Sequence, residues 1–381
     1  MIALGGALVA RGHEVLLQTW SRWHDDVRAA GMRFEPAPEY HVFPTRERPL
    51  APYEAVARAT VETRPLVASM RPDVVVADIL TLAPALAAEL EGVPVATVIP
   101  HVDPRSAPGW PPYSLGARLP RTGAGRRLWG ALSRVTDAGL ERGRRELNET
   151  RRRVGLPPLH HVHGGISRAL ALVATFPQLE YPRAVPLPAT HVIGPLLWEP
   201  PFGDVELPPG DAPLVLIAPS TSQDPSHRLL QAALAGLADL PVRVLASWNR
   251  RPVDAPLDVP ANARVVEWVS YSRTMPRCDV VVCHGGHGTV ARALASGCVV
   301  VAVPAAGDMN ENAARIDWAG VGVRVPRRLC SPRAVRLAVE RALSEPRLRE
   351  GARAIAAWSR AHDAAARGAE LIEQLAVRDA N

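Results

Sequence analysis

One stretch of the sequence, residues 279–325, restricts the possible folds more than any other. It opens with the apolar run Val280–Cys283, whose β-branched residues are typical of a buried parallel strand. The segment His284–Thr289 (HGGHGT) follows, and apolar residues then recur at helical spacing up to Gly297. Cys298–Val303 predicts the next buried strand. A strand that leads through a glycine-rich turn into a helix gathers N–H groups and the positive end of the helix dipole, so we predict an anion-binding site at this turn.

The glycine-rich turn is neither of the two best-known nucleotide loops. No Gly-Lys-Ser/Thr follows it, as a Walker loop requires, and it does not contain the Gly-x-Gly-x-x-Gly pattern of dinucleotide-binding folds. The net charge of +6 raises the question of nucleic-acid binding. The chain has no lysine, however, and its arginines are interspersed with acidic residues without an aromatic–basic module, so we expect no nucleic-acid partner.

Other compositional features narrow the class of protein. No apolar run is long enough to span a bilayer and no signal peptide is evident, so we expect no integral membrane association. The 4 cysteines form no Cys-x-x-Cys pair, which argues against a zinc ribbon or a redox pair, and the cytoplasm is the expected compartment. His160, His161 and His163 lie in a Pro/Gly-rich loop without a carboxylate nearby, so we expect no metal site there.

Strand-like and helix-like segments alternate through both halves of the 381-residue chain. This alternation predicts an α/β protein with two Rossmann-like, doubly wound parallel-sheet domains. In the second half, Leu214–Ala218 predicts a strand, and Ser226 is expected to cap the helix that follows. We expect the domains at residues 1–195 and 213–362, a Pro/Gly-rich linker at 196–212 and a C-terminal helix at 363–381.

The N-terminus departs from this scheme. Met1–Ala10 is apolar at helical spacing, and Glu14–Thr19 predicts the strand after it. A doubly wound domain normally begins with a central strand whose loop faces the ligand. The first strand of the N-terminal domain is therefore expected to be missing from this sequence.

Two polar residues stand at the carboxyl ends of predicted strands in the first half. Asp78 ends the strand at Asp73–Ala77, and His101 follows the strand at Val93–Ile99. Ligands of open α/β sheets lie beyond these strand ends, so both residues are site candidates, with loop capping as the alternative. The long loop Pro100–Gly125 is rich in Pro and Gly, as functional lids and binding walls often are.

Three loops are expected to converge in the second half. Ser220–Ser222 offers hydroxyls, the turn at 284–289 offers an imidazole and a helix N-terminus, and Gly307–Met309 offers a carboxylate. Hydroxyls and N–H groups suit phosphate, a carboxylate suits sugar hydroxyls, and Trp268 suits the face of a nucleobase. The combination fits a nucleoside diphosphate sugar, with protein dipoles in place of a metal ion at the leaving diphosphate.

Together these residues resemble the bacterial UDP-glycosyltransferase superfamily of the macrolide and natural-product type. The resemblance implies the GT-B fold, in which two Rossmann-like domains face one another across a cleft. It also implies an inverting, metal-independent transfer of a hexose-type sugar from a nucleotide sugar to a hydroxyl of a small-molecule acceptor, with no cofactor. The matching residues are HGGHGT at 284–289, then Ala293, Leu294, Gly297, Pro304, Asp308 and Asn312, with Trp268 and Val269 before them and RGHEV at 11–15.

The resemblance further implies residue roles. Trp268 and the backbone of Val269 would hold the base, while Asp308 and Met309 would contact the sugar hydroxyls, with Asn312 in the same donor-binding motif. The acceptor would lie in the N-terminal domain, and the C-terminal helix would cross back onto it. The ribose and diphosphate would be held by Ser220, Thr221, His284, Gly285, Gly286, Gly288 and Thr289.

The sequence departs from the family at several places. Ser270 and Tyr271 replace Pro-Gln, Met309 stands where many members have Gln, and Arg292 stands where plant members have a ribose-binding Glu. These differences leave open which nucleotide, UDP or dTDP, and which sugar are used.

The main departure concerns the general base. The family begins with a strand and a Gly-His-x-x-Pro loop whose histidine is that base, and Met1 matches the residue just after this proline. Asp78 matches the acid that orients the histidine. We therefore expect the natural protein to begin further upstream, in a segment that supplies the histidine. If it does not, we expect His101 to act as the substitute base.

Two other functions fit the same pattern. A nucleotide-sugar epimerase would need carboxylates around the anomeric carbon, whereas the long loop Pro100–Gly125 favours an acceptor pocket. A catalytically impaired nucleotide-binding auxiliary protein would agree with the absent base.

Overall fold

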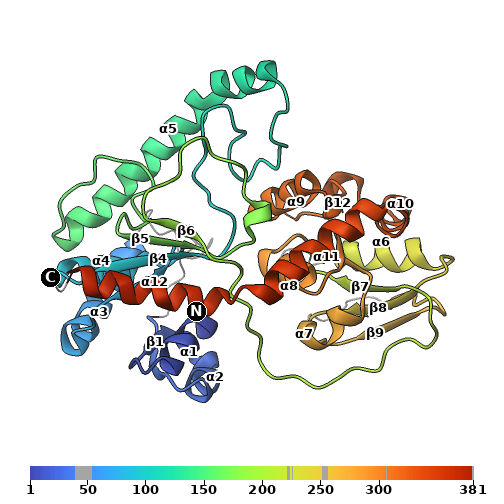
Figure 1. Cartoon of the computed structure of the whole chain (residues 1–381), viewed down its shortest axis with the longest axis horizontal. Helices are drawn as coiled ribbons and strands as arrows, with labels where there is room; N and C mark the ends of the chain where they lie inside the picture. The colour runs from blue at the N-terminus through green and yellow to red at the C-terminus, as the bar shows by residue number, and fades with distance from the viewer. Residues whose placement is uncertain (39–53, 221–223, 225, 251–255, 306, 380–381) are drawn as a thin grey trace.

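The computed structural model describes residues 1–38, 54–220, 224, 226–250, 256–305 and 307–379, and it divides into two domains with separate parallel sheets (Figure 1). The C-terminal sheet has the order β12-β11-β10-β7-β8-β9, and all its strands are parallel. Its two central strands, β7 and β10, are buried at every residue, which explains their continuous apolar sequences. The strands are β7 (Leu214–Ala218), β8 (Arg243–Ser247), β9 (Ala263–Val266), β10 (Val280–Cys283), β11 (Val299–Ala302) and β12 (Gly322–Arg324).

Helices cover both faces of this sheet (Figure 1). Helix α10 packs against α6, and α11 packs against α8 and β11. Helix α10 begins after Ser331, whose hydroxyl accepts a hydrogen bond from the backbone N–H of Ala334 at 3.3 Å. The helices are α6 (Arg228–Leu237), α7 (Tyr271–Thr274), α8 (His287–Ala295), α9 (Asp308–Ala319), α10 (Pro332–Ser344) and α11 (Pro346–Ala361), with short 3-10 turns η3 (Met275–Arg277) and η4 (Arg327–Leu329).

The N-terminal domain contains two separate pieces of parallel sheet. One has the order β3-β4-β5-β6 and the other pairs β1 with β2. Within the described ranges no strand pairs β1 with β3, and the chain opens with helix α1, as predicted. The strands are β1 (Leu16–Thr19), β2 (Arg33–Pro36), β3 (Val75–Asp78), β4 (Val95–Ile99), β5 (Leu170–Val173) and β6 (Thr190–Val192).

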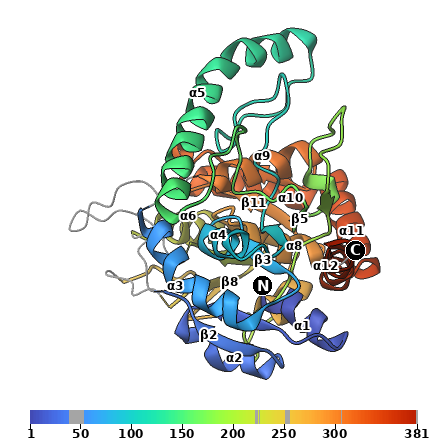
Figure 2. The ribbon, with the colours of Figure 1, turned by 90° about the vertical axis from the view of Figure 1, so that its left-hand side faces the viewer.

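The N-terminal helices include one that extends well beyond the sheet. Helix α5 spans Gly123–Val154 and projects from the body of the domain (Figures 1 and 2). The hydroxyl of Thr122 caps its start, and Gly155 ends it with a left-handed φ of 86°. The other elements are α1 (Ile2–Ala10), η1 (Ser21–Trp23), α2 (His24–Ala29), α3 (Glu54–Met70), α4 (Leu82–Leu90) and η2 (Pro177–Leu179).

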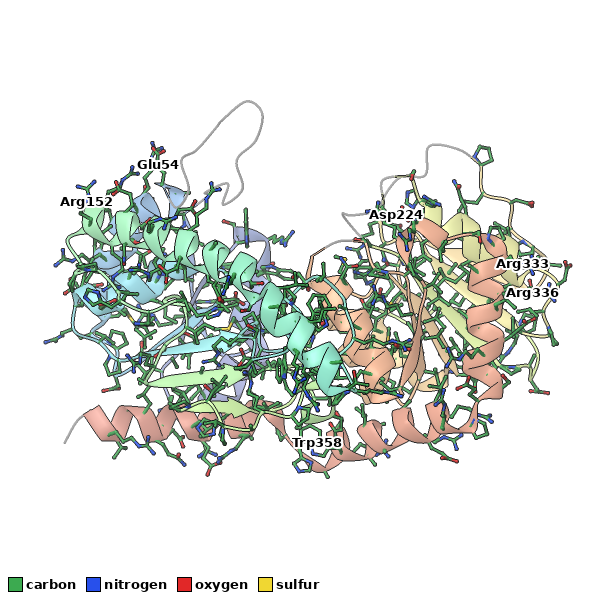
Figure 3. The ribbon with its side chains drawn as sticks, turned by 90° about the horizontal axis from the view of Figure 1, so that it is seen from above. Glu54, Arg152, Asp224, Arg333, Arg336 and Trp358 are labelled. Atoms are coloured by element: carbon green, nitrogen blue, oxygen red, sulfur yellow. The ribbon has the colours of Figure 1, made fainter. Side chains whose placement is uncertain are left out.

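The chain passes between the two domains twice. The first passage follows β6 and leads along the C-terminal domain to β7 (Figure 1). The second lies between α11 and α12 (Ala364–Asp379), and α12 packs on α1 and β5 of the N-terminal domain. Trp358 lies near this second passage (Figure 3), where its ring stacks on His362 and meets the ring of Phe176 edge-on, with centroid distances of 4.2 and 5.9 Å.

The two domains are joined by a buried ionic cluster around Arg315 of α9. Its guanidinium donates to Glu311 at 2.8 Å and to the carbonyl oxygen of Leu179 at 3.0 Å, and it lies 3.5 Å from a carboxylate oxygen of Glu180. Leu179 and Glu180 belong to the segment between β5 and β6, so α9 is held against the N-terminal domain. The loop before α5 adds a further contact, because Arg324 donates to the carbonyl oxygen of Gly116.

Candidate active site

The glycine-rich turn between β10 and α8 has the predicted strand–turn–helix form. Gly285 has a φ of +79°, and a Cβ there would lie 3.0 Å from the carbonyl oxygen of Met309. A Cβ at Gly286, the residue before α8, would lie 2.3 Å from Nε2 of His284. Glycine is therefore required at position 285 for the backbone to pass this close to α9, and glycine at 286 leaves room for the imidazole in its present position. The turn places the first N–H groups of α8 beside His284, which suits an anionic ligand.

Two of the predicted donor residues are engaged inside the protein. The side-chain amide of the buried Asn312 donates to the carbonyl oxygen of Gly285 at 2.9 Å. Thr289 is also buried, and its side chain hydrogen-bonds to the hydroxyl of Tyr271. These bonds fix the turn and the loop beside it. Direct contact of either residue with a donor stays a prediction.

His284 itself is half-buried at the end of β10, with Nδ1 3.4 Å from the carbonyl oxygen of Ala218. Burial lowers the pKa of this imidazole, while the bond to Ala218 and the charges of Asp308 and Asp224 act in the opposite direction. The ring is therefore neutral at neutral pH. It can hydrogen-bond to a ligand, but it adds no positive charge.

Asp308 begins α9, and its charge affects the pKa of residues in both domains. Its charge acts on His284 of the C-terminal domain and on Tyr113, which belongs to the long loop of the N-terminal domain. Burial raises the pKa of Tyr113, and the charges of Asp308 and Glu311 raise it further. The predicted sugar-binding carboxylate of Asp308 is thus within electrostatic reach of the long loop that carries Tyr113. Met309 follows Asp308 in the first turn of α9 and is half-buried.

The predicted base-binding residue Trp268 follows β9 and is half-buried. The guanidinium carbon of Arg250 lies 5.0 Å from the centre of the Trp268 ring and 5.7 Å from that of Phe202. Val269, the next residue in the sequence after Trp268, is buried. The indole therefore already stacks with a cation, a contact that the sequence analysis did not anticipate.

Glu199 supports the Trp268 loop from the interdomain linker. Its carboxylate accepts hydrogen bonds from the hydroxyls of Ser270 and Ser272, each at 2.5 Å, and from the backbone N–H groups of Tyr271 and Ser272 at 3.2 and 3.0 Å. Burial acts to raise the pKa of Glu199, but these hydrogen bonds dominate and hold it below its ordinary value. The linker is thereby fixed to the start of α7.

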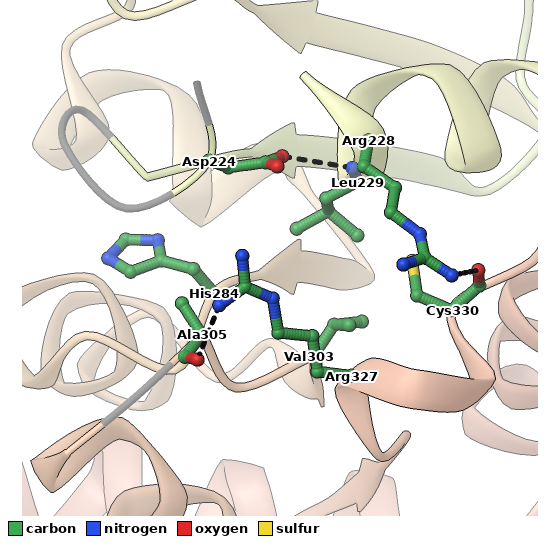
Figure 4. A pocket seen from close by; sticks show the side chains of 8 residues that line it. All are labelled: Asp224, Arg228, Leu229, His284, Val303, Ala305, Arg327 and Cys330. Atoms are coloured by element: carbon green, nitrogen blue, oxygen red, sulfur yellow. Dashed lines mark hydrogen bonds between the residues drawn. The ribbon is translucent and has the colours of Figure 1, made fainter. Parts of the chain in front are cut away.

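A small pocket adjoins His284 on the side of α6 and η4 (Figure 4). Ser220, at the end of β7, is buried, whereas Thr221 lies outside the described residues. The sequence did not lead us to the two guanidinium groups of this pocket, which belong to Arg228 and Arg327. The position of Arg327 soon after β12 was an available signal. The pocket is lined by Asp224, Arg228, Leu229, His284, Val303, Ala305, Arg327 and Cys330.

On the acceptor side, His101 lies just after β4 and is half-buried. Its Nδ1 is 2.7 Å from the carbonyl oxygen of Val102 and 3.2 Å from the hydroxyl of Tyr113. Because a carbonyl only accepts, Nδ1 carries the proton and Nε2 is the basic nitrogen. Sequence reasoning did not find Tyr113 as a partner of His101, because it lies in a loop without periodicity.

Asp78 ends β3, and its Oδ1 accepts from the backbone N–H of Leu80 at 2.8 Å. Burial raises the pKa of this carboxyl, and the Leu80 N–H, the amino group of Met1 and the charge of His101 oppose the rise. Asp78 and His101 are therefore within electrostatic reach of each other.

The glycine-rich turn also touches the N-terminal domain directly. Nε2 of His287, in the first turn of α8, lies 3.0 Å from the carbonyl oxygen of Ala174 at the end of β5. This contact brings the glycine-rich turn to the carboxyl ends of the N-terminal strands, where His101 lies.

Among the described residues, no group of three or more His, Cys, Asp or Glu side chains is arranged to hold a metal ion. In the same part of the chain, no helix is both long and apolar enough to cross a membrane.

Comparison with known proteins agrees with this geometry. Residues 231–375 match the family described as erythromycin biosynthesis protein CIII-like, C-terminal domain. The chain is 31% identical over 408 residues to 4'-demethylrebeccamycin synthase of Lentzea aerocolonigenes, covering 98% of this chain and 96% of the relative. The glycosyltransferase of kitacinnamycin has a similar structure (TM-score 0.76, 22% identity, 98% and 94% of the two chains), as does the calicheamicin glycosyltransferase CalG4 (TM-score 0.74, 22% identity, 100% and 95%).

Two parallel-sheet domains that meet at a glycine-rich turn, with structural neighbours of the same architecture, define the class of GT-B glycosyltransferases. Within this class, the chain belongs to the family of natural-product glycosyltransferases related to the erythromycin CIII protein. It is a glycosyltransferase that transfers a sugar to a small-molecule acceptor.

Proposed function

We propose that the protein transfers a hexose-type sugar from UDP or dTDP to a hydroxyl of its acceptor, with inversion at the anomeric carbon and without a metal ion. The observation that carries this proposal is the hydrogen bond between Tyr113 and His101, within electrostatic reach of Asp308. The donor-side carboxylate acts electrostatically on Tyr113, and the Tyr113 hydroxyl lies 3.2 Å from His101. A sugar held by Asp308 would thus lie beside a histidine of the acceptor domain.

His101 is the proposed general base. Its Nδ1 is engaged by Val102, which leaves Nε2 to accept the proton of the acceptor hydroxyl. Asp78 would stabilise the imidazolium that forms. As the acceptor oxygen bonds to the anomeric carbon, the bond to the diphosphate oxygen breaks and its electron pair leaves with the diphosphate. Attack opposite the leaving group inverts the configuration.

The donor is proposed to lie along the carboxyl ends of the C-terminal strands. Trp268 would stack on the base, and the N–H groups around Gly286 and Gly288 at the start of α8 would meet the diphosphate. The supporting observation is that Gly285 and Gly286, which have no Cβ, let this turn pass close to the backbone of α9 and to the His284 ring.

The base assignment is tested with His101→Ala, assayed with UDP and dTDP sugars against two kinds of acceptor. Loss of a general base should lower kcat about a hundredfold or more with an aliphatic alcohol. A phenol that is already ionised at the assay pH should be much less affected, because no proton has to be removed. His24→Ala, on exposed helix α2, is the matched control and should transfer sugar to both acceptors like the unmodified chain.

Equal loss of rate with both acceptors, or no loss with either, would reject His101 as the base. The anomeric configuration of the product, read by NMR, tests inversion. Undiminished turnover after exhaustive chelation tests metal independence.

A further inference from the structure

The small pocket beside His284 is built from four different connections between strands and helices. Its walls come from the start of α6, the ends of β10 and β11, and η4 (Figure 4). The guanidinium of Arg327 is held by the carbonyl oxygen of Ala305 at 2.9 Å, and that of Arg228 by the carbonyl oxygen of Cys330 at 3.2 Å. Both cations are therefore fixed in place by the backbone on the side of His284 that faces α6.

Positive charge to balance a bound diphosphate at the carboxyl ends of the C-terminal strands has to come from arginine. A nucleoside diphosphate carries several negative charges, whereas hydroxyls, N–H groups and the neutral His284 contribute none of the opposite sign. The chain has no lysine. The pocket contains one carboxylate, Asp224, whose Oδ2 accepts from the N–H of Leu229 at 3.0 Å at the start of α6. Two guanidinium groups against one carboxylate leave the pocket positively charged.

Three other arginines of the described residues make contacts away from this pocket. Arg315 is buried among Glu311 and Glu180, Arg324 is bonded to the loop of the N-terminal domain, and Arg250 stacks on Trp268. Arg327 and Arg228 are the cations that line a pocket together with His284.

We propose that Arg327, assisted by Arg228, binds the diphosphate of the donor. This inference rests on the proposed use of a nucleotide sugar. A guanidinium has five N–H donors, so the bond to Ala305 is compatible with a two-pronged contact to phosphate. The contact strengthens as negative charge builds up on the leaving diphosphate, and Arg327 thereby takes the part that a metal ion plays in other enzymes.

The test measures binding of a nucleoside diphosphate and of the corresponding nucleoside to the full chain, with uridine and thymidine as the two bases. Arg327→Gln should weaken diphosphate binding on the order of ten- to a hundredfold and leave nucleoside binding unchanged. Arg228→Gln should give a smaller loss of the same kind. Arg327→Lys should recover part of the affinity, because it restores a charge but not the fork of donors.

The matched controls are Arg333→Gln and Arg336→Gln on α10, which lies on the outer side of the C-terminal domain (Figure 3). They remove the same charge from the same domain and should leave both affinities unchanged. This comparison separates a local contact from the general attraction of a basic protein for anions.

Diphosphate affinity that is unchanged in Arg327→Gln, or that falls as much in the α10 controls, overturns the inference. An equal loss of nucleoside and diphosphate binding also overturns it, because such a loss reports damage to the whole site. Sugar transfer by the unmodified chain is measured separately. If the unmodified chain transfers sugar but diphosphate binding does not depend on Arg327, only this inference is rejected. If diphosphate binding depends on Arg327 but the unmodified chain transfers no sugar, only the proposed function is rejected.

Discussion

The guanidinium carbon of Arg315 lies 3.5 Å from the centre of the Tyr181 ring, and this contact joins α9 of one domain to the segment after η2 of the other. Arg315 is 2% exposed and is shared by the carboxylates of Glu311 and Glu180. Because α9 begins with Asp308, the cluster also fixes the position of the proposed sugar-binding carboxylate.

Replacing Arg315 by Met should strongly destabilise the protein. The change leaves two carboxylates in the interface without their cation, and breaking a buried pair in this way costs about 3–5 kcal/mol. Urea unfolding should show a clearly lower midpoint. Arg336→Gln, which removes a surface pair with Glu340, should change the midpoint little. A double variant with Glu311→Gln and Arg315→Met should recover part of the loss, and a single variant as stable as the parent would contradict the role of the cluster.

The contact between His287 and Ala174 should make the protein sensitive to mild acid. Nδ1 of His287 is buried without a hydrogen-bond partner among the described residues, and burial lowers the pKa of the ring to about 4, with the bond to Ala174 opposing and the charge of His101 adding to the shift. The unfolded chain, with its His at the ordinary value of about 6.5, binds the proton more readily. The contribution to stability is therefore full above about pH 6.5 and is lost as the pH falls toward 4.

His287→Gln should flatten this pH dependence, since a glutamine amide can still donate to Ala174 but does not titrate. Thermal melting at pH 7 and pH 5 measures the difference. His24→Gln, at an exposed position, should keep the slope of the parent chain. A His287→Gln variant with that same slope would show that another group controls the acid response.

Glu199→Ala should weaken nucleoside binding several-fold without changing the additional affinity that the diphosphate contributes. The carboxylate fixes the linker to the N–H groups and hydroxyls that directly follow Trp268 and Val269, so its loss should loosen the base site only. Asp204→Asn is the control, because Asp204 pairs with Arg273 in an exposed part of the same linker. Calorimetric titration with uridine, thymidine and their diphosphates provides the measurement, and a selective loss of diphosphate affinity would count against the assignment.

Trp268→Ala should weaken binding of the free nucleoside. The expected loss of binding free energy is that of one stacked base, about 1–3 kcal/mol. Trp20, which is 54% exposed and belongs to the N-terminal domain, offers a control substitution that removes another indole. If both variants bind thymidine and uridine equally well, Trp268 does not stack on the base and the contact with Arg250 is purely structural.

The parts of the fold that were predicted well are those set by local sequence. Val280–Cys283 forms a strand whose β-branched apolar residues are buried between two neighbouring strands, and the glycines after it permit the tight turn. Ser226 was wrong as a helix cap, because the residue before α6 is His227 in a left-handed conformation, and Asp224 accepts from the helix instead.

The contacts that complete the site could not be read from local pattern. Tyr113 meets His101 across a loop of irregular sequence, and Arg315 reaches Leu179 across a separation of 136 residues. The sequence pattern likewise marked Asn312 as a donor residue without showing that its amide supports Gly285. Such relationships depend on how the two domains dock, and no periodicity in the chain encodes that arrangement.

The point where the chain passes between the domains has a mechanical consequence. Gly194, where the linker leaves the N-terminal domain, approaches Trp358 of α11 so closely that a Cβ would lie 3.1 Å from the indole. Both covalent connections therefore run through one spot. Any movement of one domain relative to the other would therefore share a single hinge point, at which neither connection has to stretch.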